Sequence, residues 1–236
     1  ARRLRQRICT VIDWAVAKGY RDAGLAMPVI DAALPKQRAK PKHHKAVAHA
    51  ELPAFIGELR QSESMGRLAL EAVILTAARS GEVRLAQWSE LDLEAGLWTL
   101  PAERMKAERE HVVPLSLTAV SLFKRMKAHK RGDSDLVFPG QRRGKPLSDM
   151  TLVKVMRDME HKETPHGFRS TFRDWVAEQT TWPAELAEAA LAHVVSDKTV
   201  AAYQRGSMLE KRRELMAAWA DYCEGASGGN VVRLAQ

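Results

Sequence analysis

Cysteine is scarce in this chain of 236 residues, which contains only Cys9 and Cys223. The two lie far apart and form no CxxC pair, so the sequence excludes a cysteine-rich zinc site and offers no framework of disulfide bonds. Such usage is typical of a reducing cytosol, and we expect a cytoplasmic protein. No apolar run approaches the roughly 20 residues needed to cross a bilayer, so we expect no membrane partner.

The sequence also lacks the motifs of several common chemistries. GxGxxG, HExxH and GxSxG are absent, which leaves dinucleotide binding, zinc-dependent proteolysis and acyl transfer without support. The loop from Gly140 to Pro146 resembles a Walker A loop, but only three residues separate its glycines, and Pro146 stands where Ser or Thr would bind Mg²⁺. His43 and His44 lie in a basic segment and are better explained as a solvated pair than as metal ligands. We therefore expect no metal and no cofactor.

Positive charge is concentrated at the beginning of the chain. Residues 1–50 contain 11 Lys or Arg and three Asp or Glu, whereas residues 51–236 contain 26 of each. The net charge of +8 therefore arises in the first fifth of the chain. A basic arm ahead of a balanced domain favours a polyanionic partner, most often nucleic acid, over a merely solvated surface. We expect DNA-backbone contacts from the basic residues of this arm, which are Lys36, Arg38, Lys40, Lys42 and Lys45.

Hydrophobic spacing, proline and charge divide the chain into three parts: residues 1–34, a basic linker over 35–48, and a larger domain over 49–236. Apolar residues at helical spacing predict a helix over 5–19 in the first part. In the larger domain the same spacing predicts helices over 53–60, 66–78, 83–88, 117–130, 148–160, 166–180, 183–192, 198–204 and 208–223. Strand-like segments at 97–100 and 111–115 predict a β-hairpin around a charged connection, and 231–234 a terminal strand.

Cationic and hydrogen-bonding residues in the larger domain are candidates for a functional site. Arg79 follows an apolar helix, where pairing with a neighbouring carboxylate is the ordinary explanation. His166 and Arg169 are spaced i and i+3, so on a helix they share one face about 5–6 Å apart. Two donors on one face suit a phosphate or a carboxylate, although an ordinary surface pair has the same spacing. His193 and Tyr203 lie beside apolar helical residues, where such side chains usually belong to the core.

Taken together and in this order, these residues resemble those of the tyrosine recombinases, or phage-type integrases, and especially the integrases of prophages and genomic islands. Arg79 with Glu82 is similar to the family's first arginine box, and His166 with Arg169 to its H-x-x-R box. Lys106, in the charged connection of the hairpin, is similar to the family's β-hairpin lysine. His193 matches a position that holds His or Trp, and Tyr203 matches the nucleophile. Neighbouring segments that resemble the family are 88–92, 98–101, 111–116, 137–140 and 212–216.

This resemblance covers about residues 49–224 and implies a mainly α catalytic domain with a small antiparallel β-sheet and a C-terminal tail. Residues 1–34 then resemble part of the family's helical core-binding domain. The family often has glycine where this chain has Ala77 and Ala192, at tight helix junctions that admit a methyl group if φ is negative.

The resemblance also implies site-specific DNA recombination or integration without a metal. Tyr203 would attack the phosphate, form a 3′-phosphotyrosyl intermediate and release a 5′-hydroxyl, so no ATP is needed. Arg79 and Arg169 would neutralise the non-bridging oxygens, because guanidinium groups present paired donors to phosphate. His166 would assist proton transfer or orient the phosphate, and His193 would donate to a non-bridging oxygen. Lys106 would protonate the leaving oxygen, with Arg104 and Arg109 of the same hairpin as alternatives.

The implied partners are double-stranded DNA attachment sites, a homo-tetramer assembled on DNA, and a directionality factor. The implied location is the cytoplasm at the nucleoid, for a bacterial or phage-encoded protein. Two other functions share this fold. One is DNA relaxation by a type IB topoisomerase, which His166 disfavours because that family is expected to have lysine there. The other is a catalytically silent DNA-binding module, which should have lost at least one of the six site residues.

Overall fold

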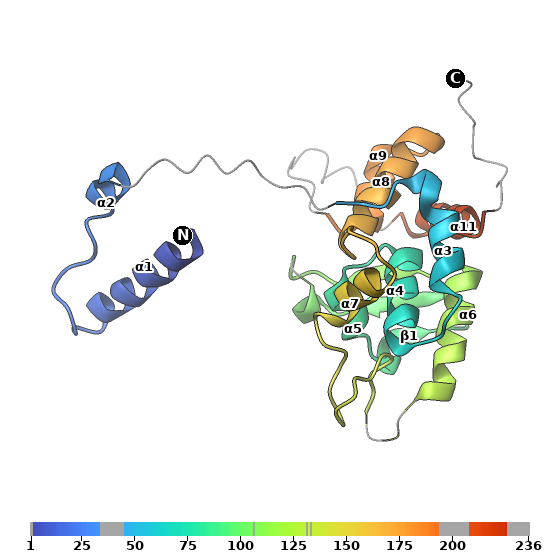
Figure 1. Ribbon diagram of the computed structural model, residues 1–236, viewed down its shortest axis with the longest axis horizontal. Coiled ribbons are helices and arrows are strands. Elements are labelled where there is room, and N and C mark those ends of the chain that lie inside the picture. Colours follow the sequence, from blue (N-terminus) through green and yellow to red (C-terminus); the bar gives the residue numbers. More distant parts are fainter. Residues whose placement is uncertain are drawn as a thin grey trace. The chain divides into compact units, whose positions relative to one another are not determined.

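The computed structural model describes residues 2–33, 45–105, 107–130, 132, 134–193 and 208–225 (Figure 1). The chain divides into two compact units, Ala1–His43 and His44–Gln236. Among the described residues, no helix is both long enough and apolar enough to cross a bilayer.

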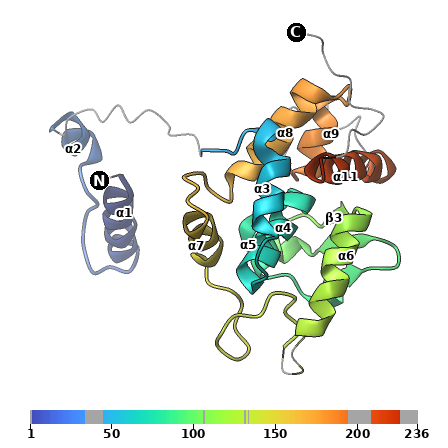
Figure 2. The same ribbon diagram turned by 45° about the vertical axis from the view of Figure 1, so that its right-hand side comes forward.

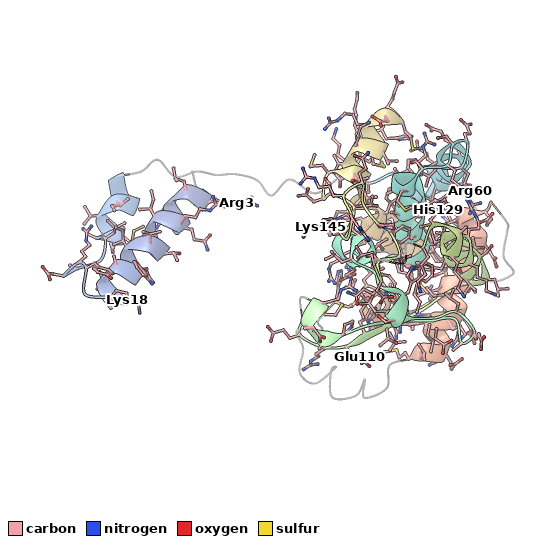
Figure 3. All side chains as sticks on the ribbon, turned by 90° about the horizontal axis from the view of Figure 1, so that it is seen from below. Arg3, Lys18, Arg60, Glu110, His129 and Lys145 are labelled. Carbon is pink, nitrogen blue, oxygen red and sulfur yellow. The ribbon has the colours of Figure 1, made fainter. Side chains whose placement is uncertain are left out.

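The first unit contains two helices, α1 (Arg2–Ala17) and α2 (Met27–Ala33). The predicted helix over 5–19 corresponds to α1, and the structure adds α2, which the prolines obscured. Pro28 is the second residue of α2, a position where its missing N–H breaks no helical hydrogen bond. Arg3 and Lys18, near the two ends of α1, project into solvent (Figure 3).

The second unit consists of helices around a small sheet. Its α-helices are α3 (Leu52–Leu59), α4 (Met65–Thr76), α5 (Ser80–Arg84), α6 (Leu117–Met126), α7 (Thr151–Asp158), α8 (Gly167–Gln179), α9 (Ala184–Ala190) and α11 (Leu209–Cys223). Its 3-10 helices are η1 (His49–Glu51), η2 (Trp88–Glu90), η3 (Ala102–Arg104) and η4 (Lys127–His129). These bounds confirm the predicted helices at 53–60, 66–78, 117–130, 148–160, 166–180, 183–192 and 208–223, whereas the segments 198–204 and 231–234 lie outside the described residues.

The helix α4 is the centre of this unit. It packs against α3, α5, α6, α7, α8 and α11, and ten of its twelve residues are buried (Figure 2). Its start is fixed by Ser64, whose side chain accepts a hydrogen bond from the backbone N–H of Arg67. Because all faces of α4 touch other elements, both ends of the helix are held in place.

The helix predicted at 83–88 is wrong in its bounds, since α5 occupies Ser80–Arg84. The Glu82 carboxylate accepts the backbone N–H of Arg79 at 2.7 Å, and this cap begins the helix three residues earlier than the apolar pattern suggests. The small polar residues Ser80 and Gly81 carry no hydrophobic signal that could have located this start.

The predicted hairpin is confirmed as part of a three-stranded antiparallel sheet in the order β1-β2-β3. The strands are β1 (Leu91–Asp92), β2 (Leu97–Leu100) and β3 (His111–Pro114). Leu97 pairs with Pro114, and Leu100 pairs with His111. The strand β1 is only two residues long, which is too short for a period-2 pattern to reveal.

An aromatic cluster joins α8 to α11. Phe172 and Trp175 of α8 pack against Trp219 of α11, with ring centroids 5.2 and 5.0 Å away. Trp219 also donates its indole N–H to the Ile74 carbonyl oxygen at 2.8 Å. The cluster therefore fixes α8 and α11 against α4.

Candidate active site

Arg169 lies where the C-terminal ends of α4 and α9 meet the first turn of α8. Its side chain is buried, with 5% of the residue exposed. One guanidinium nitrogen, Nη1, donates to the Ala77 carbonyl oxygen at 2.6 Å, and Nη2 donates to the Leu191 carbonyl oxygen at 2.5 Å. Carbonyls at helix ends lack intrahelical partners and carry the negative end of the helix dipole. The guanidinium therefore satisfies and links two helix ends.

Both helix ends turn through alanines with positive φ. Ala77 has φ of 51° and Ala192 has φ of 49°, which is the left-handed region that favours glycine. The condition under which a methyl group would fit these junctions without strain, a negative φ, is therefore not met at either alanine. Each of the two left-handed turns lies beside Arg169. The carbonyl oxygens of Ala77 and Leu191 accept hydrogen bonds from its guanidinium.

This backbone strain gives a stability prediction. Ala192→Gly should raise the free energy of unfolding by about 0.5–1 kcal/mol, because left-handed φ costs an alanine about 1–2 kcal/mol and the extra entropy of unfolded glycine returns part of it. Chemical denaturation measures the change. The matched control is Ala217→Gly in the middle of α11, which should lose about 1 kcal/mol. Equal losses in both variants would contradict the strained junction.

Arg79 stands next to Arg169 as the residue that begins α5. Its guanidinium Nη1 is 2.7 Å from Glu82 Oε1, and its side chain remains 26% exposed. Burial, and secondly the positive charge of Arg79, lower the pKa of Arg169 to about 10. The positive charges of the two guanidinium groups therefore repel each other. Arg79 pairs with Glu82, as its ordinary structural explanation requires, and its charge also acts on the second arginine.

His193 completes the described part of the site. Its Nε2 lies 3.0 Å from Arg169 Nη2, its Nδ1 lies 2.5 Å from Glu188 Oε2, and its side chain is 41% exposed. His166 precedes α8 and is exposed, whereas Arg169 three residues later is buried. The structure thus brings Arg79, Arg169 and His193 together, with His166 at the start of the same helix as Arg169.

The end of the basic linker lies against the turn that carries His166. The Lys45 carbonyl accepts the N–H of Thr164 at 3.1 Å. A Cβ atom on Gly167 would lie 2.3 Å from the same oxygen, so only glycine fits here. Lys45 is exposed. The other four basic linker residues, Lys36, Arg38, Lys40 and Lys42, lie outside the described residues.

Two further predicted site residues, Lys106 and Tyr203, also lie outside the described residues. The structure does describe Arg104, an alternative to Lys106, and Tyr222, another tyrosine of the second unit. The guanidinium of Arg104 is held by the Glu90 carboxylate and by the Glu82 carbonyl oxygen, so this side chain anchors the hairpin to η2 and α5. The hydroxyl oxygen of Tyr222 lies 2.9 Å from His49 Nδ1, and burial raises the pKa of the Tyr222 phenol.

Sequence reasoning missed three residues around this site: Glu188, His111 and Arg212. Burial, and then the charge of Arg212, lower the pKa of His111 to about 4, so its imidazole is neutral at pH 7. Arg212 is 3% exposed and donates to the Val112 carbonyl oxygen at 2.8 Å. Glu188 lies on α9, five residues before His193, and no short sequence motif contains Glu188. Arg212 and His111 each carried a signal, because each begins a segment that resembles the family.

The arrangement suits a tetrahedral anion. The Arg169 guanidinium contacts the His193 imidazole and lies within the field of the Arg79 charge. Arginine donors match the geometry of phosphate oxygens. Among the described residues, no group of three or more His, Cys, Asp or Glu side chains is placed to hold a metal ion.

Comparisons with known proteins identify relatives of this chain. The family model described as the phage integrase family matches residues 45–210. The integrase of Enterobacteria phage P4 is 33% identical over 244 residues, covering 95% of this chain and 55% of the relative. Prophage integrase IntZ of Escherichia coli (strain K12) is 35% identical over 233 residues, covering 98% of this chain and 57% of the relative. The chain thus spans little more than half the length of these relatives.

Solved structures show the same fold. A lambda integrase dimer bound to a COC' core site matches with a TM-score of 0.55 at 20% identity, over 86% of this chain and 58% of that one. XerA recombinase matches with a TM-score of 0.52 at 15% identity, over 80% and 65%. The expected fold class, mainly α with a small antiparallel sheet and of the tyrosine recombinase type, is therefore confirmed. Because the family model covers more than half of its residues, the chain belongs to the phage integrase family.

Proposed function

We propose that this chain cleaves and rejoins DNA strands in site-specific recombination, by metal-free phosphoryl transfer through a 3′-phosphotyrosyl intermediate. The observation that carries the proposal is the position of Arg169, buried between two helix ends with Arg79 and His193 beside it. Donors already held in place stabilise developing negative charge without reorganising during the reaction. The integrases among the relatives favour recombination over DNA relaxation.

The proposed reaction has one bond formed and one broken at phosphorus. The Tyr203 phenol oxygen bonds to phosphorus and gives up its proton, with His166 assisting the transfer or orienting the phosphate. The bond from phosphorus to the 5′ oxygen breaks, and Lys106 gives this oxygen a proton. Arg79, Arg169 and His193 donate to the non-bridging oxygens. Rejoining reverses the steps on a new 5′-hydroxyl, so the phosphoester energy is retained.

The proposed partners follow from the same family. The structural neighbours include a lambda integrase dimer on a core site and a lambda integrase tetramer bound to a Holliday junction. For this chain we propose double-stranded DNA attachment sites and a homo-tetramer on DNA, with a directionality factor as a regulator. The basic linker would contact the DNA backbone, and the protein would act in the cytoplasm at the nucleoid.

A covalent-complex assay tests the proposed function. Suicide DNA carries a nick near the scissile phosphate, so the released fragment diffuses away and the protein stays attached. We expect an adduct that survives denaturation, forms in the presence of EDTA and maps to Tyr203. DNA binding without any adduct would support the catalytically silent alternative.

The hairpin lysine gives a second chemical prediction. Lys106→Ala should slow cleavage by about 10²–10⁴-fold, the usual effect of removing a general acid. A substrate with bridging 5′-sulfur should restore most of that loss, because a thiol has a pKa of about 8.5 and its thiolate leaves without a proton. Arg104→Ala should not be rescued, since Arg104 is bound by Glu90 and the Glu82 carbonyl. Rescue of Arg104→Ala or Arg109→Ala, but not of Lys106→Ala, would assign the acid to another residue.

A further inference from the structure

Glu188 is a partly buried carboxylate that contacts His193 at Nδ1, whereas Arg169 contacts the other ring nitrogen. Its side chain on α9 is 25% exposed, and both of its oxygens are engaged. Oε2 lies 2.5 Å from His193 Nδ1, and Oε1 lies 2.9 Å from Nε of Arg173 on α8. The carboxylate is therefore fixed by one helix and presents its second oxygen to the imidazole.

The hydrogen-bond directions determine which nitrogen of His193 carries the proton. A guanidinium group donates and never accepts. His193 Nε2, 3.0 Å from Arg169 Nη2, is therefore the acceptor, and the proton of the neutral ring lies on Nδ1. Glu188 receives that proton at its Oε2. The ring is thus bonded at both nitrogens, and neither its tautomer nor its rotation is free.

We propose that Glu188 is a positioning residue of this active site, which fixes the tautomer and the orientation of His193. The proposal rests on the proposed function, in which Nε2 of His193 donates a hydrogen bond to a phosphate oxygen. When phosphate arrives, Glu188 still holds Nδ1, and Nε2 remains turned toward the phosphate oxygen. A carboxylate that orients an imidazole through its far nitrogen is a recurrent arrangement in catalysis.

The kinetic test compares Glu188→Ala, Glu188→Gln and Glu185→Ala in single-turnover cleavage of suicide DNA. Glu188→Ala should slow adduct formation about 10–100-fold, the usual loss when a carboxylate that orients a functional histidine is removed. Glu188→Gln should keep most of the rate, because its amide oxygen still accepts the Nδ1 proton. Glu185, an exposed carboxylate one turn earlier on α9, is the matched control and should leave the rate unchanged.

A double variant separates positioning from general support of the fold. If Glu188 acts through His193, the variant with both Glu188→Ala and His193→Ala should cleave no more slowly than His193→Ala alone. Losses that multiply would show that Glu188 acts independently of His193 and would overturn the proposal. A wild-type rate in Glu188→Ala would also overturn it.

Nitrogen-15 NMR of the histidine rings provides a readout without DNA. The unaltered protein and Glu188→Gln should show His193 with its proton on Nδ1. In Glu188→Ala the ring is no longer held at Nδ1 and turns away from the Arg169 guanidinium, so the proton should shift toward Nε2. An unchanged tautomer in Glu188→Ala would overturn the proposal. If the unaltered protein forms no DNA adduct, the proposed function fails, and the tautomer measurement still decides whether Glu188 orients His193.

Discussion

Replacing Tyr203 with phenylalanine should abolish covalent attachment to DNA and leave DNA affinity nearly unchanged. The substitution removes one oxygen, and that oxygen is the atom that attacks phosphorus in the proposed reaction. Contacts with the DNA backbone depend on charged side chains elsewhere and should persist. Electrophoresis of denatured adducts measures attachment, and fluorescence anisotropy of labelled DNA measures affinity.

Tyr222 provides the matched control for this experiment. Its hydroxyl lies 2.9 Å from His49 Nδ1, and its ring stacks on Trp219. Tyr222→Phe should therefore lower the free energy of unfolding by about 1 kcal/mol through the lost hydrogen bond, without reducing attachment. An adduct that persists in Tyr203→Phe and maps to Tyr222 or Tyr20 would show that the nucleophile is misassigned.

The second large effect is expected at Arg169. Arg169→Ala should reduce cleavage by about 10²–10³-fold or more, the usual loss for one preorganised donor to a developing anion. It should also lower the free energy of unfolding by about 1–3 kcal/mol, since the buried carbonyls of Ala77 and Leu191 lose their partner. Arg169→Lys keeps the charge, but one ammonium group cannot reproduce the fork that spans both carbonyls. We expect this variant to cleave DNA little better than Arg169→Ala.

The variant Arg60→Ala is a control that separates the loss of stability in Arg169→Ala from its loss of cleavage. The Arg60 guanidinium pairs with the buried Glu71 and with Glu224, and it shares no partner with the candidate active site. Arg60→Ala should therefore lower stability by a comparable amount, about 1–3 kcal/mol, because it leaves Glu71 buried without its partner. Cleavage by the folded fraction should not change. Wild-type cleavage by Arg169→Lys would refute the requirement for paired donors.

The sequence was most informative where a function depends on residue type and order. The family resemblance singled out Arg79, Arg169 and His193, which the structure brings together from the start of α5, from α8 and from the turn after α9. Hydrophobic periodicity located α4 and α8, because their buried faces repeat at helical spacing. It misplaced α5, whose start depends on a hydrogen bond from Arg79 to Glu82 rather than on apolar residues.

Other features depend on tertiary contacts and leave no local pattern. The positive φ of Ala192 is visible only in the backbone, since alanine usually favours the helical region. The pairing of Glu188 with His193 joins two residues that no motif spaces together, and its other partner, Arg173, belongs to a different helix. The sequence contained these residues, but not the contacts that give them a role.

The close fit of Lys45 against Gly167 has a mechanical consequence. The carbonyl of Lys45 is bonded to the N–H of Thr164, and no side chain separates it from the backbone at Gly167. Tension on the chain that precedes residue 45 is therefore transmitted first to the turn holding His166, ahead of the helical core. Lys45 thus fastens the start of the described part of the second unit to the turn that carries His166.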